Sequence, residues 1–164
     1  MSGQKIPVDR SRGRRLLNGP AAPSGAKAHG ACVDAWLERS AKNLPPELLL
    51  RVFEAALGAL WGRTQSTLGE VTLTAIAERV LSRASEKFPL LSALKVEPPE
   101  GIQCRELRKG IGVIQPTVLL EAIRFVLVEF LTVLGNLTAE ILTPELHAEL
   151  SNVSLPSLTN REGT

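Results

Sequence analysis

The chain of 164 residues contains few aromatic side chains, and this scarcity limits how it can build a core. It has no tyrosine, two tryptophans and four phenylalanines, which together make up 4% of the chain. The core must therefore consist of Leu, Val, Ile and Ala, which suit the packing of helices better than a β-sandwich. With 44% apolar and 22% charged residues, the composition excludes a fibrous protein and wholesale disorder. The length allows one domain with a hydrophobic core and is too short for two.

Cysteine and long uncharged runs are also scarce. Cys32 and Cys104 are too few for a disulfide framework, and their use is compatible with a reducing cytoplasm. No continuous apolar stretch follows the first charges, so no secretory signal peptide is predicted. The most apolar window, residues 118–134, is interrupted by three charged residues, whereas a membrane span needs ~20 nearly uncharged ones. We therefore expect a soluble, cytoplasmic protein without transmembrane insertion.

Histidine and aspartate, the usual partners in triad chemistry, occur only twice each. Asp9 and His29 fall in a segment with little apolar surface, where a catalytic base cannot be held in a fixed geometry. His147 falls in a predicted short helix whose glutamates two positions before and after it face away, so we expect a surface histidine. We predict no catalytic residues, and hence a protein that is not an enzyme.

Motifs for metals and phosphates are missing as well. His29 and Cys32 are three residues apart, but Cys104 and His147 are 43 apart, whereas zinc ligands come as two closely spaced pairs. The glycines of residues 110–112 lack the third glycine of a dinucleotide fingerprint and the Gly-Lys-Ser/Thr of a P-loop. We predict no metal and no cofactor.

Positive charge is concentrated at the start of the chain. Residues 1–31 contain six basic side chains and one acidic one, a net charge of +5, and the remainder contains 13 basic and 16 acidic side chains, a net charge of −3. Because this first segment has little apolar surface, we predict a flexible basic arm over residues 1–31. The arm is either a solubilising tail or a polyanion-binding segment, whose contacts are then made by Arg10, Arg12, Arg14 and Arg15.

The remaining patterns are helical. The pair Pro45-Pro46 predicts the start of a helix that runs to Arg63, followed by a turn over residues 64–69. Residues 70–87 have one apolar stripe and one polar face. Residues 98–101 predict an irregular connection, beside which a minor β-hairpin near residues 95–104 is possible.

Pro116 opens the dominant predicted element, a long apolar helix over residues 116–137. We predict an all-α fold, a compact multi-helix bundle around this central helix, with a single domain over residues 32–150 and a polar C-terminal tail over residues 151–164. The predicted core residues are Leu73, Ile76, Val80, Leu81, Ile123, Leu127, Phe130, Leu131 and Leu134.

One sector of the long helix is polar yet contains two large apolar residues. We predict that this sector is an interface, formed by Glu121, Arg124, Phe125, Val128 and Thr132. The sequence thus favours a non-catalytic regulatory or sensory module for protein–protein interaction and signalling, whose partner is a second copy (a homodimer or other homo-oligomer) or another helical protein. Two alternatives stay open: an apolar pocket between this helix and residues 70–87 that binds a small hydrophobic ligand, or nucleic-acid binding through the arm.

Overall fold

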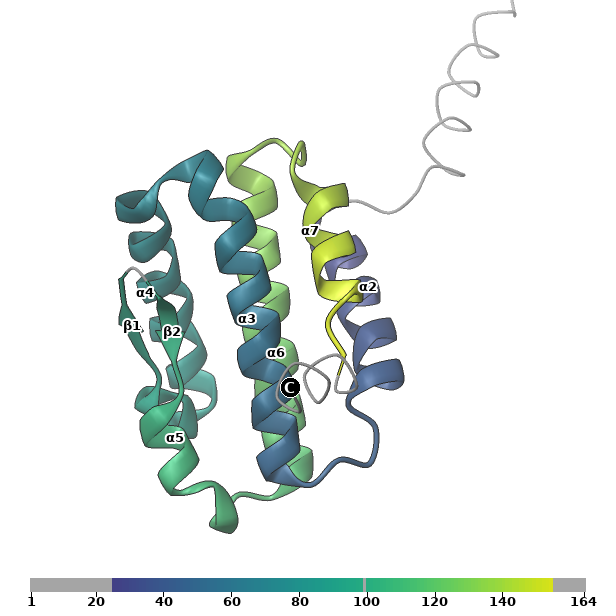
Figure 1. Cartoon of the computed structure of the whole chain (residues 1–164), viewed down its shortest axis with the longest axis vertical. Helices are drawn as coiled ribbons and strands as arrows, with labels where there is room; N and C mark the ends of the chain where they lie inside the picture. Colours follow the sequence, from purple (N-terminus) through teal and green to yellow (C-terminus); the bar gives the residue numbers. More distant parts are fainter. Residues whose placement is uncertain (1–24, 99, 155–164) are drawn as a thin grey trace, which may run out of the picture.

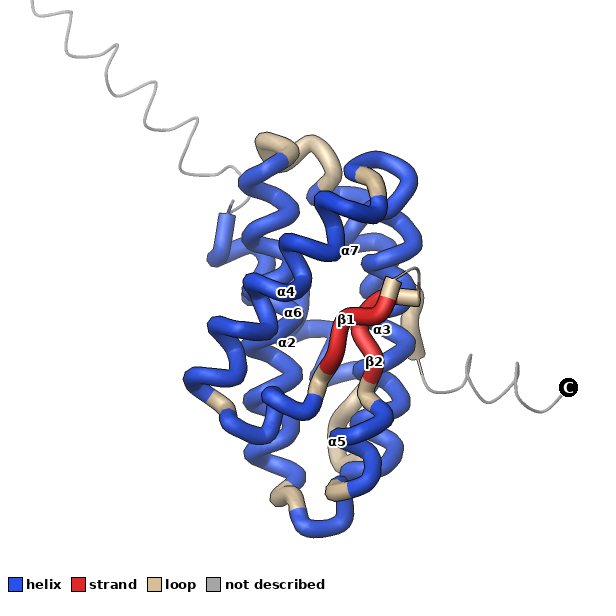
Figure 2. Tube along the Cα trace, turned by 90° about the vertical axis from the view of Figure 1, so that its left-hand side faces the viewer, coloured by secondary structure: helices blue, strands red, loops and turns tan. Residues whose placement is uncertain are grey.

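The structure is a computed structural model that describes residues 25–98 and 100–154, and its helices form two layers. In the first layer, α6 (Pro116–Leu137) lies between α2 (Gly25–Ser40) and α4 (Glu70–Lys87), as Figures 1 and 2 show. Both flanking helices pack directly against α6. The prediction of an all-α bundle around a long central helix is confirmed.

The second layer covers the first on the side that faces the viewer in Figure 1. It consists of α3 (Pro46–Leu68), α7 (Thr143–Ser151) and a two-stranded antiparallel hairpin. The hairpin pairs β1 (Lys95–Glu97) with β2 (Gly101–Gln103), so the predicted minor hairpin is present. Three short elements complete the described part of the chain: η2 (Pro89–Ala93), α5 (Arg105–Lys109) and η3 (Ile111–Val113).

The central position of α6 follows from its apolar circumference. A helix at the surface needs an apolar stripe over only part of its circumference, whereas α6 is apolar on several sides. In the structure α2, α3, α4 and α7 all pack against it. Every predicted core residue of α4 and α6 is buried, and Leu127, Phe130, Leu131 and Leu134 are wholly inaccessible to solvent.

The turn between α3 and α4 is much shorter than the sequence predicts. Helix α3 continues past Arg63 to Leu68, and Gly69 alone connects it to α4. The hydroxyl of Thr64 donates to the carbonyl of Leu60, so this side chain is satisfied within the helix. Gly69 has a φ of 87°, a left-handed conformation that glycine adopts without strain. The predicted turn over residues 64–69 is therefore wrong for five of its six positions.

The hairpin lies directly on the indole ring of Trp61. A Cβ atom at Gly101 would come within 2.9 Å of this ring, so no larger residue fits there without displacing the strand. Gly101 also has a φ of 107°, which disfavours any residue with a side chain. This contact fixes the strands against α3 and covers the space between α3 and α4.

The ends of the domain differ from the predicted boundaries. Helix α2 begins at Gly25, and His29 and Gly30 are buried, so the last seven residues of the predicted arm belong to a helix. The four arginines predicted to bind polyanions lie outside the described residues. At the other end, the indole Nε1 of Trp36 donates to the carbonyl of Val153 at 2.8 Å. Residues 151–154 of the predicted tail thus belong to the domain.

Shortening a buried side chain of α6 tests its central position. We expect Leu127→Ala and Leu131→Ala each to lower the free energy of unfolding by about 2–5 kcal/mol, because each leaves a cavity in the core. The control is Val113→Ala, since Val113 is 89% exposed, and its effect is expected within about 0.5 kcal/mol. Chemical denaturation measures the free energy of unfolding of all three variants. Equal losses at Leu127, Leu131 and Val113 would contradict the central position of α6.

Candidate functional site

The predicted interface residues lie on the side of α6 that faces away from α3 and between α2 and α4. Glu121 and Arg124 are exposed, and the side chains of Phe125, Val128 and Thr132 are half-buried. No helix or strand of the described residues covers this side of α6, which we call the outer face. Side chains from α2 and α4 reach over its edges, so the outer face is only partly open.

On the α2 side, an ion pair holds the two helices together. The guanidinium of Arg124 donates from Nε to Oδ1 of Asp34 at 2.6 Å and from Nη2 to Oδ2 at 3.1 Å. These hydrogen bonds hold the pKa of Asp34 below its usual value. Gly30 leaves room for the guanidinium, because a Cβ there would approach Nη2 to 3.3 Å. The two side chains are about half exposed, so the pair stabilises the fold only modestly.

On the α4 side, two phenylalanines and a lysine form a second contact. The rings of Phe88 and Phe125 are 5.9 Å apart between centroids. The ammonium of Lys87 lies 5.0 Å from the centroid of Phe125 and 5.9 Å from that of Phe88, so the cation faces both rings. Phe125 is therefore not a free apolar side chain, as the sequence suggested, because part of its surface packs against its own chain.

A surface cavity of about 470 Å³ lies between α2 and α6 beside the outer face. Leu37 and Leu120 supply its apolar surface, and its other lining residues are polar or charged: Asp34, Glu38, Lys42, Asn43, Glu121 and Arg124. A smaller cavity of about 200 Å³ adjoins Lys87, Phe88 and Phe125 on the α4 side. The larger cavity thus differs from the predicted ligand pocket, since it lies against α2 instead of α4 and has a charged rim.

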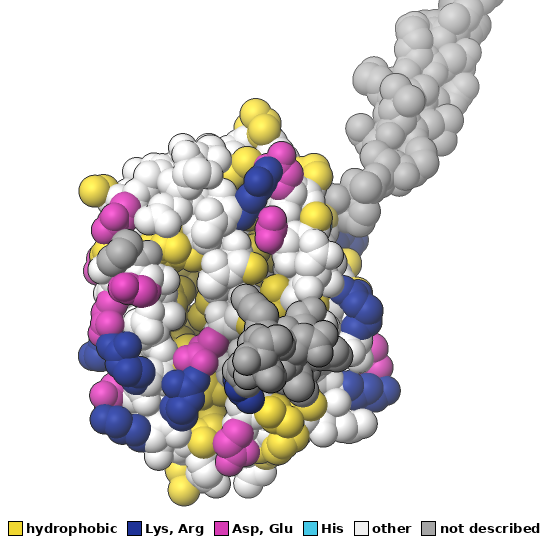
Figure 3. Space-filling view, in the orientation of Figure 1, with side chains coloured by type: hydrophobic (Ala, Val, Ile, Leu, Met, Phe, Trp, Pro, Cys, Tyr) yellow, Lys and Arg dark blue, Asp and Glu magenta, His cyan; other side chains and the backbone are white. Residues whose placement is uncertain are grey.

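The opposite side of the molecule carries charges of both signs close together. Figure 3 shows basic side chains beside acidic ones over the hairpin and α5. Arg105 pairs with Glu97 at 2.6 Å, Lys109 pairs with Glu106 at 3.2 Å, and Arg108 pairs with Glu54. A nucleic-acid surface needs an excess of positive charge, and these pairs neutralise one another.

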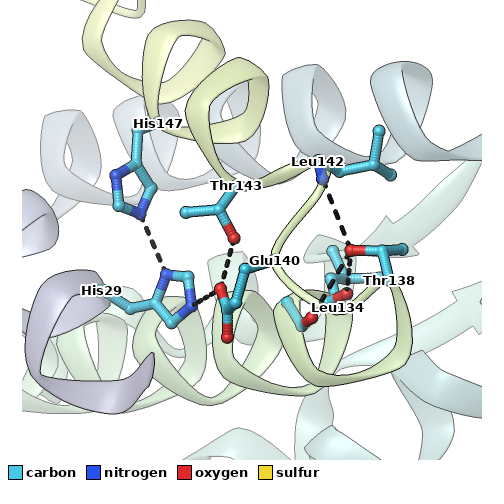
Figure 4. A network of polar contacts seen from close by, with 8 residues as sticks. His29, Leu134, Thr138, Glu140, Leu142, Thr143 and His147 are labelled. Atoms are coloured by element: carbon cyan, nitrogen blue, oxygen red, sulfur yellow. Dashed lines mark hydrogen bonds and ion pairs between the residues drawn. The ribbon is translucent and has the colours of Figure 1, made fainter. Parts of the chain in front are cut away.

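A contact between a buried and a half-buried histidine is the main feature that the sequence did not reveal. Nδ1 of His29 lies 2.9 Å from Nε2 of His147, and the two rings are nearly perpendicular. Nε2 of His29 lies 3.4 Å from Oε1 of Glu140, which also accepts a hydrogen bond of 2.5 Å from the hydroxyl of Thr143 (Figure 4). His29 is wholly buried and His147 is half-buried, so the predictions of a histidine in a flexible arm and of a surface histidine are both wrong.

The loop after α6 aims Glu140 at His29. The amide of Glu140 donates to the carbonyl of Gly135, and the amide of Ala139 donates to that of Asn136, the paired bonds of a Schellman motif. Ala139 and Glu140 have φ values of 53° and 64°, a left-handed conformation in which residues other than glycine are strained. A Cβ at Gly135 would come within 2.6 Å of Oε1 of Glu140 and 2.9 Å of Nε2 of His29. Only glycine at position 135 therefore allows this approach.

The two cysteines are free thiols. Cys104 is wholly buried, and burial together with the nearby Glu54 carboxylate raises its pKa to about 12. Cys32 is half-buried, and burial also raises its pKa. Both thiols are thus poor nucleophiles at neutral pH.

Residues 25–98 and 100–154 contain neither a metal-ligand cluster nor a membrane-spanning helix. No three or more His, Cys, Asp and Glu side chains in these ranges are grouped so that they could hold a metal ion. Nor does any helix there have both the length and the apolar character that crossing a membrane requires.

Comparisons with known proteins identify no family and no relative for this chain. No protein-family model, no curated protein and no solved structure matches this chain.

The strained loop gives a testable prediction. We expect Ala139→Gly to raise the free energy of unfolding by about 0.5–1 kcal/mol, because glycine removes the left-handed strain at a cost in chain entropy. The matched control is Ala75→Gly, at an exposed position within α4, which we expect to lower that free energy by about 1 kcal/mol. Thermal and chemical denaturation show whether each variant has a higher or a lower free energy of unfolding than the wild type. A loss of stability in both variants would contradict the inference that the backbone at Ala139 is strained.

Proposed function

We propose that this protein is a non-catalytic interaction module of regulatory or sensory type, which associates with a second copy of itself through the outer face of α6. The observation that carries the proposal is the set of half-exposed apolar side chains left on the central helix: Leu120, Phe125 and Val128. A central helix normally buries such residues against its own chain. Their exposure on the outer face is typical of a surface that a partner covers.

Charge complementarity supports a second copy as the partner. Glu121 on the outer face makes no ion pair with any residue in the described part of the chain. Lys87 contacts aromatic rings and has no carboxylate partner there. A two-fold axis through the outer face brings the surface of one copy against the same surface of the other. Because this surface carries unpaired charges of both signs, it can be complementary to itself.

A non-catalytic role agrees with the state of the reactive side chains. His29 is wholly buried and its ring contacts only protein groups. A general base must come within hydrogen-bond distance of a substrate proton, and a wholly buried ring does not meet this condition. The free thiols are compatible with a cytoplasmic location, which we include in the proposal.

Reversal of single charges tests the self-association. We expect the wild-type chain to sediment as a dimer, and Glu121→Lys or Lys87→Glu to weaken the dimer about tenfold or more, because like charges then meet across the axis. The double variant Glu121→Lys/Lys87→Glu restores charges of both signs and is expected to recover much of the affinity. These substitutions are preferable to changing Phe125, which also packs within the monomer.

The control is Glu78→Lys, also on α4. Glu78 lies nine positions before Lys87, which places it on the opposite side of the helix. We expect this variant to leave the dimer unchanged. A monomeric wild type would contradict the proposal, as would a dimer that neither reversal weakens. A monomer that carries a stoichiometric hydrophobic adduct in native mass spectrometry would instead favour the ligand-binding alternative.

A further inference from the structure

The histidine pair joins three parts of the chain that are distant in sequence. His29 comes from the first turns of α2, His147 from α7, and Glu140 from the loop between α6 and α7. In Figure 4 the second ring nitrogen of His147 points away from His29. The contact between the two rings is thus the polar link between the start of α2 and α7.

The contacts of the two rings indicate which nitrogens carry a hydrogen when both rings are neutral. Nε2 of His29 faces Oε1 of Glu140 at 3.4 Å without the geometry of a hydrogen bond, but a neighbouring carboxylate favours a hydrogen on the nitrogen that faces it. Nδ1 of His29 is then the acceptor in the pair. Nε2 of His147 must therefore donate to Nδ1 of His29 across 2.9 Å. A single hydrogen occupies the space between the two rings. This assignment follows from the acceptor-only character of the carboxylate.

The pair accommodates one additional proton but not two. A first proton can bind the outer nitrogen of His147, Nδ1, and every contact is kept. A second proton must bind Nδ1 of His29, and two N–H groups then face each other across a distance that suits one hydrogen bond. Two cationic rings would also lie 5.1 Å apart between centroids, away from most of the solvent.

We propose that His29, His147 and Glu140 form an acid-sensitive latch, which holds the start of α2 against α7 and releases it when both rings become protonated. This proposal is independent of the proposed dimer, because the latch lies on another side of α2 from Asp34.

Few charged groups face the latch. The loop contributes Glu140, and α6 contributes Gly135, which has no side chain. The two acidic residues of α7, Glu145 and Glu149, lie near Arg63 of α3, and Glu145 pairs with it at 2.5 Å. Glu140 is therefore the one carboxylate among the described residues that directly offsets a charge on His29.

The surroundings make the protonated rings unfavourable. Burial lowers the pKa of His29, and Glu140 offsets this only in part. Burial and the neighbouring His29 lower the pKa of His147. Because these pKa values lie below those of free histidine, an open latch binds protons more tightly than a closed one. Acid therefore favours opening, from about pH 6.5 downward.

The release is expected to stay local. Beyond His29, α2 is held by the Asp34–Arg124 ion pair and by the buried side chains of Val33 and Trp36. The indole of Trp36 also holds Val153. Opening therefore frees the first turns of α2 and the loop around Glu140, and the interior of α6 keeps its packing.

Hydrogen exchange of the full chain at pH 7.5 and pH 5.0 tests the latch. After correction for intrinsic exchange rates, we expect amide protection in residues 29–33 and 140–147 to fall about tenfold or more per pH unit below pH 6.5, since each proton taken up contributes a factor of ten. Residues 123–131 of α6 serve as the internal reference and are expected to keep their protection. Because the chain has only two histidines, proton NMR can follow both rings without ambiguity, and both are expected to titrate below pH 6.5.

Two variants give opposite expectations. His147→Gln keeps an N–H donor toward His29 but does not titrate, so His29 alone can take up a proton and the pH dependence of exchange should become weaker than in the wild type. Glu140→Gln removes the charge that stabilises the first proton in the closed state, so opening should begin at a higher pH than in the wild type. Three results would overturn the proposal: unchanged protection of α2 at pH 5.0, an equal loss of protection in α6, or a wild-type response in His147→Gln.

Discussion

The need to cover α6 on almost every side determines the arrangement of the other elements. An apolar helix of 22 residues cannot lie at the surface of a small domain, so α2, α3, α4 and α7 pack around it. The hairpin then closes the space between α3 and α4, where Gly101 lies on Trp61. On the outer face, where no helix of residues 25–98 and 100–154 packs against α6, Arg124, Lys87 and Phe88 cover part of the surface. Both the stability of the fold and the proposed interface thus depend on how far this single helix is covered.

Helix α2 is held in place mainly by contacts outside itself. It contains two glycines, has no acidic residue in its first turn and includes few large apolar residues, so its own sequence favours helix only weakly. Three polar links compensate for this weakness: His29 to His147, Asp34 to Arg124, and Trp36 to Val153. In the proposed latch, the loss of the histidine link frees the start of α2 while the other two links stay in place.

The sequence predicts best those features that depend on local patterns. The apolar stripe of residues 70–87 and the apolar run of residues 116–137 identify α4, α6 and the core between them, because side-chain periodicity follows directly from helix geometry. The continuation of α3 past Arg63 is not marked in the sequence, because residues 64–69 are mostly polar, whereas Thr64 bonds within its own helix. The start of α2 is not marked either, because its glycines and alanines resemble those of the residues before it.

The latch could not be predicted by the same reasoning. His29 and His147 are 118 residues apart, and no periodic pattern connects them. The loop that orients Glu140 has alanine and glutamate at left-handed positions, where glycine or asparagine would have marked the motif in the sequence. The outer face was accessible to sequence analysis because its residues follow one another along a single helix. The sequence could not indicate that Lys87 and Phe88 cover part of Phe125, because they are distant from it along the chain.

The stacking of the hairpin on Trp61 gives this domain an optical signal of its own. Since the chain has no tyrosine and only two tryptophans, its intrinsic fluorescence comes almost entirely from two indoles at different places in the fold. The ring of Trp61 is covered by the backbone at Gly101, and the nitrogen of Trp36 is bonded to Val153. Replacing either tryptophan with phenylalanine would leave a spectrum that reports on one region alone, either the docking of the hairpin or the attachment of the C-terminal residues to α2.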